Sequence, residues 1–237
     1  MRKAIIIGAT SGIGRELAVV MSRAGYAVGL AGRRLELLEG LRKELGDGSC
    51  IKRMDVAKPV AMEQLKELIT EMGGADVVVI SSGTGAINPG LEWGKEKETI
   101  DVNVSGFAAM ANVAFEHFRG LGEGHIVGIS SIAAIRGGGA APAYNASKAF
   151  VSNYLEGLRQ KAVKLKLPIA VTEIQPGFVD TAMAQGEGLF WVAPAQKAAC
   201  QIFRAIEMKK SHAYVTRRWR LIAWLLKLMP DRLYCGL

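Results

Sequence analysis

The strongest indication of the fold is the segment Lys3-Ala4-Ile5-Ile6-Ile7-Gly8-Ala9-Thr10-Ser11-Gly12-Ile13-Gly14. Its β-branched run at 3–7 predicts a buried strand, and residues 12–24 predict a helix that Gly25 ends. The glycines between them allow a tight turn and let a phosphate approach the backbone at the positive end of the helix. Because the spacing of Gly8, Gly12 and Gly14 differs from the commonest dinucleotide fingerprint, two interpretations stay open: a phosphate-binding loop and a plain strand-to-helix turn.

The rest of the chain continues this alternation of strand and helix patterns. Strands are predicted at 3–7, 27–31, 50–54, 77–80, 125–129, 169–174 and 213–215, and helices at 12–24, 35–45, 62–72, 96–118, 142–166 and 194–208. Residues 182–193 look irregular. Repeated βα units with short connections predict an α/β fold, a doubly wound parallel sheet of the Rossmann type with helices on both faces.

The length of 237 residues and a hydrophobic share of 50% suit one large domain with a sizeable core. We see no linker and no internal repeat, so residues 1–216 are interpreted as the catalytic domain and residues 217–237 as a C-terminal extension. The apolar run after Met1 is too short for a secretory signal. Three scattered cysteines have neither disulfide nor metal-ligand spacing, which predicts a reducing cytoplasm and no metal site.

The formal net charge of +8 is concentrated near the C-terminus. Residues 204–237 contain eight lysines and arginines and only two acidic residues. Such a segment can meet nucleic acid, anionic lipid or an acidic partner. The chain has no motif typical of a nucleic-acid-binding protein, so no nucleic-acid partner is expected.

The end of the second predicted strand indicates which dinucleotide the loop would hold. An acid usually stands there when the ribose 2′-hydroxyl of NAD is bound, but this chain has Gly32-Arg33-Arg34. A guanidinium can hold a 2′-phosphate through two hydrogen bonds, so we predict NADP(H), with Arg33 as the main contact and Arg34 as support. A solvated arginine pair at a helix start is the alternative. Phosphate contacts would come from the loop residues Gly8, Thr10, Ser11, Gly12, Ile13 and Gly14.

A candidate proton-transfer pair follows in the second half of the chain. Tyr144 and Lys148 are four residues apart, which places them on one face of the predicted helix. The pKa of a free tyrosine is about 10, and a nearby ammonium lowers the pKa of the phenol toward neutral pH. Ser131 comes thirteen residues earlier, at the carboxyl end of a predicted parallel strand, where its hydroxyl could bond a carbonyl or only cap a turn.

Taken in order, these motifs resemble the short-chain dehydrogenase/reductase family over roughly residues 3–216. The resemblance rests on the glycine loop, Asp55-Val56, Asn103, Ser131, Tyr144-x-x-x-Lys148 and the segment from Pro176-Gly177 to Val179-Asp180-Thr181. Order and spacing together make it specific. One departure is Ser81-Ser82-Gly83-Thr84, where the family often has Asn-Asn-Ala-Gly. There, Gly83 keeps the backbone permissive while the asparagine hydrogen bonds are lost or replaced by hydroxyls.

The resemblance implies a catalytic set and a cofactor set. Tyr144 would be the general acid/base, Lys148 would lower the pKa of Tyr144 and hold the nicotinamide ribose, Ser131 would polarise the carbonyl and Asn103 would support a proton relay. Further cofactor contacts implied are Asp55 and Val56 at the adenine, Gly83 after the fourth strand, and Pro176, Gly177, Val179 and Thr181 on the nicotinamide side. Ser130 is one residue off the family spacing and stays outside the catalytic set.

The implied activity is hydride transfer between NADP(H) and a carbonyl/alcohol substrate, a small or lipophilic ketone, aldehyde or 3-oxoacyl group. Met183, Leu189, Phe190 and Trp191 form either an apolar lid over this substrate or ordinary packing. The alternative function is an NADPH-binding regulatory or scaffold protein that acts through the basic tail. The family implies a homodimer or homotetramer built on the helices near 96–118 and 142–166.

The C-terminal extension contains an amphipathic pattern. If residues 219–229 form a helix, Trp219, Leu221, Leu225 and other apolar residues are expected on one broad face, with Arg220 and Lys227 on the other. Such a helix is too short to span a bilayer, which needs about 20 residues. Peripheral membrane contact, packing over the active site and a dimer contact are the three interpretations that stay open.

Overall fold

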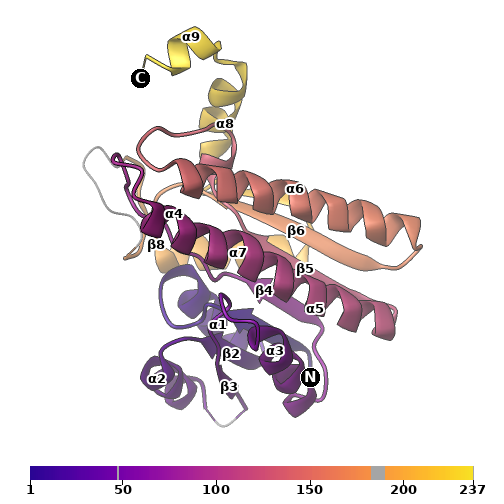
Figure 1. Cartoon of the computed structure of the whole chain (residues 1–237). Coiled ribbons are helices and arrows are strands. Elements are labelled where there is room, and N and C mark those ends of the chain that lie inside the picture. Colours follow the sequence, from indigo (N-terminus) through magenta and orange to yellow (C-terminus); the bar gives the residue numbers. More distant parts are fainter. Residues whose placement is uncertain (47, 183–189, 237) are drawn as a thin grey trace.

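The computed structural model describes residues 1–46, 48–182 and 190–236. Its centre is a seven-stranded, fully parallel sheet in the order β3-β2-β1-β4-β5-β6-β9 (Figure 1). The strands are β1 Lys3–Ile7, β2 Ala27–Gly32, β3 Cys50–Arg53, β4 Val77–Ile80, β5 Gly124–Ile129, β6 Ile169–Pro176 and β9 His212–Val215. The predicted doubly wound α/β fold is confirmed, and the strand order reverses between β1 and β4.

Helices cover both faces of this sheet. On one face lie α1 Gly12–Arg23, α2 Leu35–Leu45 and α7 Ala195–Glu207, and on the other lie α3 Ala61–Glu71, α5 Phe107–Leu121 and α6 Pro142–Lys164. Successive side chains of a strand point to opposite faces, so Ile5 and Ile7 pack under α3, α5 and α6 while Ala4 and Ile6 pack under α1 and α7. Strands buried on both faces explain the continuous apolar runs of the sequence.

The prediction of one unbroken helix over 96–118 is wrong. The structure has α4 Trp93–Ile100, then a π-helical turn Asp101–Gly106, then α5. A π turn adds a residue to the turn without changing the residue types, so an apolar pattern cannot reveal it. The turn carries Asn103, whose side chain is buried.

Element ends differ from the sequence-based bounds by a few residues, as in β6, which continues to Pro176. Two short strands flank the segment 182–193 predicted to be irregular. β7 Val179–Asp180 comes just before it and pairs with β8 Ala193–Pro194, which begins at its last residue. Met183 and Leu189, proposed as part of a lid, lie outside the described residues.

Two C-terminal helices, α8 Trp219–Leu228 and α9 Asp231–Tyr234, project from the body next to the start of α6 (Figure 1). The expected helix is present, and Arg220 and Lys227 lie on one side of it, opposite a broad apolar face. Only part of that face packs on the body: Trp219 and Ala223 are buried, with Ile222 and Leu226 partly buried beside them. The rest of the face, the apolar stripe Leu221, Trp224, Leu225 and Leu228, remains exposed.

Candidate active site

A cavity of about 620 Å³ opens at the carboxyl ends of the parallel strands. Its walls include the last residues of β1, β2, β5 and β6, among them Ile7, Ile129 and Pro176, and the loops that follow β3 and β4. In doubly wound sheets, ligands bind in this crevice at the point where the strand order reverses. The sheet therefore places the cavity where such folds bind dinucleotides.

The glycine loop is shaped by contacts that leave no room for side chains. Gly8 has φ +93°, and a Cβ built on it would stand 2.5 Å from the backbone nitrogen of Ser82. A Cβ on Gly14 would stand 2.2 Å from the carbonyl oxygen of Gly8. Both positions meet backbone atoms, which cannot rotate away as a side chain can. The loop thus turns tightly against β4 and brings the first turn of α1 to the cavity.

The N-terminus of α1 is arranged to receive an anion. Ser11 is the N-cap residue, but its side chain does not bond the first-turn N–H groups, and the first turn contains no acidic residue. Unpaired N–H groups and the positive end of the helix dipole attract phosphate. Arg34 adds positive charge, because its guanidinium donates hydrogen bonds to the hydroxyls of Thr10 (2.8 Å) and Ser11 (2.9 Å).

One end of the cavity is bordered by Arg33, Arg34, Asp55 and Val56. Arg33 is exposed, and the Asp55 carboxylate accepts a hydrogen bond from the backbone N–H of Ala57 (3.1 Å). Asp55 is therefore fixed by its own loop, whereas the Arg33 side chain can turn toward a ligand. A dinucleotide with a 2′-phosphate fits this donor set, since two guanidinium groups stand where an acid would repel it.

Tyr144, Lys148 and Ser131 meet at the other end of the cavity. The first turns of α6 present Tyr144 and Lys148 on one face, with the Lys148 Nζ atom 5.7 Å from the centre of the Tyr144 ring. Lys148 is buried and donates a hydrogen bond to the Ile129 carbonyl (3.1 Å). Ser131 Oγ accepts from the backbone N–H of Ala133 (3.1 Å), which orients its hydroxyl at the end of β5.

Burial dominates the acid–base properties of this pair. It raises the pKa of Tyr144 above its usual value, and hydrogen bonding to Ser131 works in the opposite direction. Burial also lowers the pKa of Lys148 to about 8. That Lys148 lowers the pKa of Tyr144, as the resemblance implies, stays a prediction; burial acts in the opposite direction on the phenol, because desolvation disfavours its charged form.

Asn103 acts on the loop after β4 and not on the cavity itself. Its Oδ1 accepts from the backbone N–H of Thr84 (2.8 Å), and its Nδ2 donates to the Thr84 carbonyl (2.7 Å) and to Ser147 Oγ (2.9 Å). The buried amide therefore ties the π turn to the β4 loop and to α6. Gly83 stands between these groups, since a Cβ there would lie 3.3 Å from Lys148 Nζ. The loop that lacks the family's asparagines is held by Asn103 instead.

The structure brings together nearly all the residues that the sequence singled out. Those that line the cavity are Gly8, Thr10, Ser11, Gly12, Ile13, Arg33, Arg34, Asp55, Val56, Gly83, Ser131, Tyr144, Lys148, Pro176, Gly177, Val179 and Thr181. Gly14 and Asn103 are not among the lining residues. Each contacts a residue that does line the cavity: Gly14 approaches Gly8 closely, and Asn103 bonds to Thr84. Ser130 also lines the cavity, but its hydroxyl donates to the Lys148 carbonyl (2.9 Å).

Sequence reasoning missed residues that hold Tyr144 and the loop after Ser131 in place. Gly85 packs flat against the Tyr144 ring, because a Cβ there would lie 2.5 Å from a ring carbon. Asn145 donates to the carbonyls of Ala133 (3.1 Å) and Arg136 (2.8 Å) and so fixes the loop after Ser131. The position of Asn145 directly after Tyr144 was the one sequence signal that could have indicated its role in fixing this loop. No local pattern marks Gly85.

Apolar side chains surround the space beyond Tyr144. They include Ile87, Ile132, Ala133, Ala141 and Phe178. An apolar wall around a few polar groups is typical of a small-molecule site, in which the polar groups fix the orientation of the ligand.

Comparison with known proteins agrees with this geometry. The sequence model described as short chain dehydrogenase matches residues 2–189. An uncharacterised oxidoreductase of Myxococcus xanthus is 40% identical over 185 residues, which cover 75% of this chain and 72% of that protein. The chain belongs to the short-chain dehydrogenase family and is an oxidoreductase.

Solved structures share the fold at low sequence identity. A closed form of serine dehydrogenase complexed with NADP+ superposes with a TM-score of 0.80 at 24% identity, covering 89% of this chain and 92% of that one. A 3-ketoacyl-(acyl-carrier-protein) reductase from Brucella melitensis, complexed with NADH, gives a TM-score of 0.78 at 20% identity, covering 91% and 98%. Both likenesses show the fold, and the two proteins carry different nicotinamide dinucleotides.

Proposed function

We propose that the protein transfers a hydride reversibly between NADP(H) and a carbonyl/alcohol substrate. The observation that carries the proposal is one continuous cavity with a phosphate-binding loop and two arginines at one end, and Ser131, Tyr144 and Lys148 at the other. Neither half by itself defines the reaction. Together they support a reaction in which a proton donor stands beside the bound nicotinamide.

The residues present fit a dinucleotide. The N–H groups at the start of α1 would hold the pyrophosphate, Asp55 and Val56 would border the adenine, and Lys148 would hold the nicotinamide ribose. On the nicotinamide side, Thr181 faces the loop, since a Cβ on Gly12 would lie 3.0 Å from its Cγ2. When bound, the reduced nicotinamide supplies the hydride.

The side chains of the site supply the proton and the orientation. Ser131 Oγ would donate a hydrogen bond to the substrate carbonyl oxygen, and the Tyr144 hydroxyl would give its proton to the same oxygen during reduction. A raised pKa keeps Tyr144 protonated and ready to act as an acid. Lys148, with a pKa of about 8, is mostly protonated near neutral pH, and its ammonium would stabilise the phenolate that forms when Tyr144 gives up its proton. The apolar wall around Phe178 favours a lipophilic ketone, aldehyde or 3-oxoacyl group over a charged substrate.

A protein that only sensed NADPH would need less of this machinery. Phosphate binding requires the glycine loop and Arg33, but it does not require a buried lysine beside a tyrosine and a serine. Burying Lys148 is costly, and a cost of this kind is typical of a catalytic site. The arrangement therefore favours the oxidoreductase over the regulatory alternative.

Turnover of NADPH tests the proposal directly. We expect oxidation of NADPH, followed by its absorbance, with at least one member of a panel of diketones, aromatic aldehydes, steroid ketones and 3-oxoacyl thioesters. Apolar members should react faster than charged ones of equal size, because Ile87, Ile132 and Phe178 line the substrate end. Tight binding of NADPH without turnover across the panel would favour the regulatory alternative, and no binding of either dinucleotide would exclude both.

Replacing Arg33 tests the choice of cofactor. In Arg33→Ala we expect the Kd for NADPH to rise about tenfold, because one exposed charge-assisted contact to the 2′-phosphate is lost. The Kd for NADH should stay unchanged, because NADH has no 2′-phosphate. Titration of both dinucleotides by fluorescence measures this. Arg42→Ala, an exposed arginine on α2, is the matched control and should change neither constant. An equal weakening for both dinucleotides would show that Arg33 does not read the 2′-phosphate.

The homodimer or homotetramer and the cytoplasmic location stay predictions. The assembly would use α5 and α6, and sedimentation velocity of the full chain would show its mass.

A further inference from the structure

Exposed large apolar side chains gather around the mouth of the cavity and on α8. Three segments supply them: Ile87, Leu91 and Trp93 before and at the start of α4, Phe190, Trp191 and Val192 before β8, and Leu221, Trp224, Leu225 and Leu228 on α8. Ile87 lines the cavity, and the ring of Phe190 lies 5.8 Å from that of the cavity-lining Phe178. Apolar surface gathered in this way, and not scattered singly, marks an interaction site.

The start of α8 is anchored in the wall of the cavity. Trp219 is buried, and its ring centre lies 5.3 Å from that of Phe178 and 5.2 Å from that of Phe190. Gly177 makes room for it, since a Cβ on Gly177 would lie 1.9 Å from the indole. Arg218 donates to the carbonyl of Trp191 (2.9 Å), which attaches the helix to the segment before β8 as well.

The other end of α8 is fastened by Arg136, from the loop after Ser131. Its guanidinium donates to the Met229 carbonyl (2.9 Å), pairs with the Asp231 carboxylate (2.6 Å) and lies 4.4 Å from the centre of the Tyr234 ring. Because both ends of α8 are held, the helix cannot rotate about its axis to bury the exposed stripe. The stripe Leu221, Trp224, Leu225 and Leu228 therefore stays on the outside.

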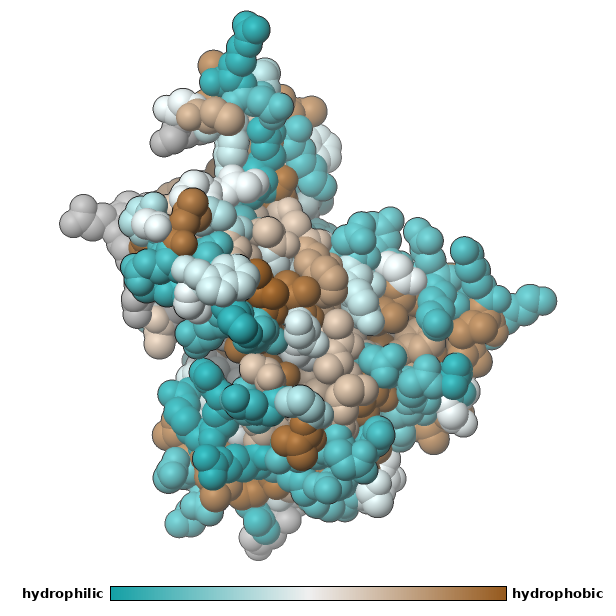
Figure 2. Space-filling model, in the orientation of Figure 1, coloured by the Kyte–Doolittle hydropathy of each residue, from teal (hydrophilic) through white to brown (hydrophobic). Residues whose placement is uncertain are grey.

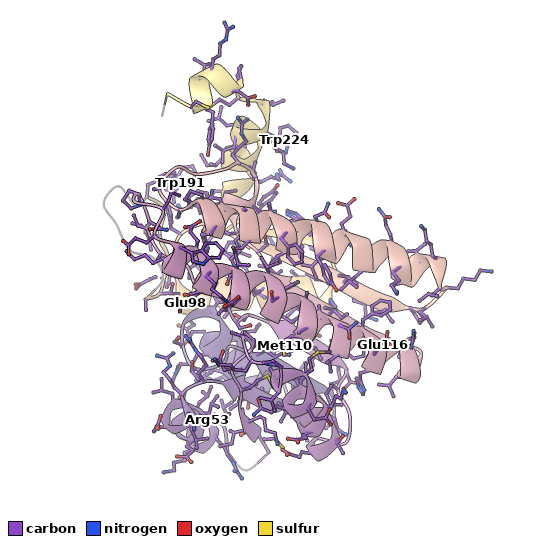
Figure 3. All side chains as sticks on the ribbon, viewed as in Figure 1. Arg53, Glu98, Met110, Glu116, Trp191 and Trp224 are labelled. Atoms are coloured by element: carbon purple, nitrogen blue, oxygen red, sulfur yellow. The ribbon has the colours of Figure 1, made fainter. Side chains whose placement is uncertain are left out.

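This stripe has the spacing of a docking face. Its members follow one another at i, i+3, i+4 and i+7, and they are 66%, 65%, 57% and 79% exposed. Burying such side chains away from water is favourable in proportion to the apolar area removed. Figure 3 shows Trp224 on α8 and Trp191 near its base, so exposed tryptophans lie both on the helix and beside the cavity mouth.

Basic side chains lie beside the stripe, along one side of α8 and at its two ends. Residues 217–237 contain five lysines and arginines and one acidic residue, and that acid, Asp231, is paired with Arg136. Arg220 and Lys227 are exposed beside the stripe, and Figure 2 shows hydrophilic and hydrophobic side chains next to one another on the C-terminal helices. A basic rim beside leucine and tryptophan is complementary to anionic lipid headgroups over an acyl layer.

A second copy of the chain fits the exposed stripe on α8 less well than an anionic lipid surface does. In a two-fold contact the same surface faces itself, so the basic rim of one α8 would oppose that of the other. Such repulsion within about 10 Å is only partly screened by salt. An anionic surface turns the same charges into attraction.

We propose that this end of the molecule docks on an anionic lipid surface, with α8 lying in the interface. Within the described part of the chain, no helix is long and apolar enough to cross a membrane. The stripe enters the acyl boundary, the tryptophans lie at headgroup level and the basic rim contacts the headgroups. Docking is independent of the reaction proposed above.

Sedimentation with vesicles tests the docking on the full chain. We expect the protein to pellet with vesicles of phosphatidylglycerol and phosphatidylcholine in equal amounts, less at high salt, and to stay in solution with phosphatidylcholine alone. Brominated acyl chains should quench tryptophan fluorescence in the bound protein and not in Trp224→Phe to the same extent.

Two sets of variants separate the stripe from the rim. Leu221→Gln/Trp224→Gln/Leu225→Gln should reduce partition to the anionic vesicles at least tenfold. The matched control Leu121→Gln/Met208→Gln replaces side chains of similar exposure elsewhere (58% and 66%) and should bind like the wild type. Arg220→Glu/Lys227→Glu should abolish the preference for anionic vesicles, while Lys43→Glu/Lys164→Glu, on α2 and at the end of α6, should keep it.

NADPH binding is measured on every variant, so that loss of docking is distinguished from loss of the fold or of the proposed function. Equal pelleting of the wild type and the stripe variant would overturn the proposal, as would no pelleting of the wild type. A concentration-dependent dimer that the stripe variant dissociates, without vesicle binding, would assign the stripe to a second copy and overturn it as well.

Discussion

Tyr144→Phe should lower kcat for NADPH oxidation by about a hundredfold to ten-thousandfold, the usual contribution of a positioned general acid. The substitution removes one hydroxyl and keeps the ring that packs against Gly85 and lies over Lys148 Nζ. The fold and the affinity for NADPH should therefore stay unchanged. Steady-state kinetics with the best substrate of the panel, together with an NADPH titration, measures both quantities.

Tyr154→Phe is the matched control for this prediction. Tyr154 lies on the same helix, α6, where its ring stacks on Phe150 (centroids 5.3 Å apart), and it is not among the residues that line the cavity. Its kcat should equal that of the wild type. If Tyr144→Phe kept kcat within a few-fold of the wild type, another group would have to donate the proton, and the proposed role of Tyr144 would be wrong.

Gly14→Ala should weaken NADPH binding about tenfold or more. The added Cβ would stand 2.2 Å from the carbonyl oxygen of Gly8 and 3.0 Å from its carbonyl carbon. Backbone atoms on both sides must then move apart, at a cost of about 1–3 kcal/mol, and the phosphate-binding N–H groups move with them. An NADPH titration measures the loss, and circular dichroism verifies that the variant is folded.

Gly40→Ala makes the same chemical change in α2, where a Cβ meets nothing within 4 Å. It should leave NADPH binding unchanged and raise the free energy of unfolding by about 0.5–1 kcal/mol, because alanine has the higher helix propensity. Wild-type affinity in a folded Gly14→Ala variant would mean that the approach of Gly14 to Gly8 does not shape the phosphate site.

The fold and much of the candidate site could be predicted because their signals are local. A β-branched run such as 77–80 marks a strand covered on both faces, and Gly8, with φ +93°, marks a turn that other residues adopt at a cost. Tyr144 and Lys148 share a face because four residues make about one helical turn. Parallel strands then bring their carboxyl ends to one edge, which is how Ser131 reaches Tyr144.

Features that depend on contacts between distant segments could not be predicted. The π turn at Asp101–Gly106 leaves the residue pattern unchanged, and the bonds of Asn103 to Thr84 join residues 19 positions apart. The pKa shifts of Tyr144 and Lys148 arise from burial, which no short stretch of sequence contains. The division of α8 into a packed face and an exposed stripe follows from the anchoring of its two ends by Phe178 and Arg136.

The doubly wound sheet, the tight glycine turn and the shared helix face of Tyr144 and Lys148 could thus be predicted from the residues, since periodicity, glycine and helical spacing act over a few residues. Folding adds the hydrogen bonds by which Asn103 holds the loop after β4, the burial that raises the pKa of Tyr144 and the outward position of the apolar stripe on α8. These properties are set by desolvation and by hydrogen bonds between elements, and both exist only once the chain has folded.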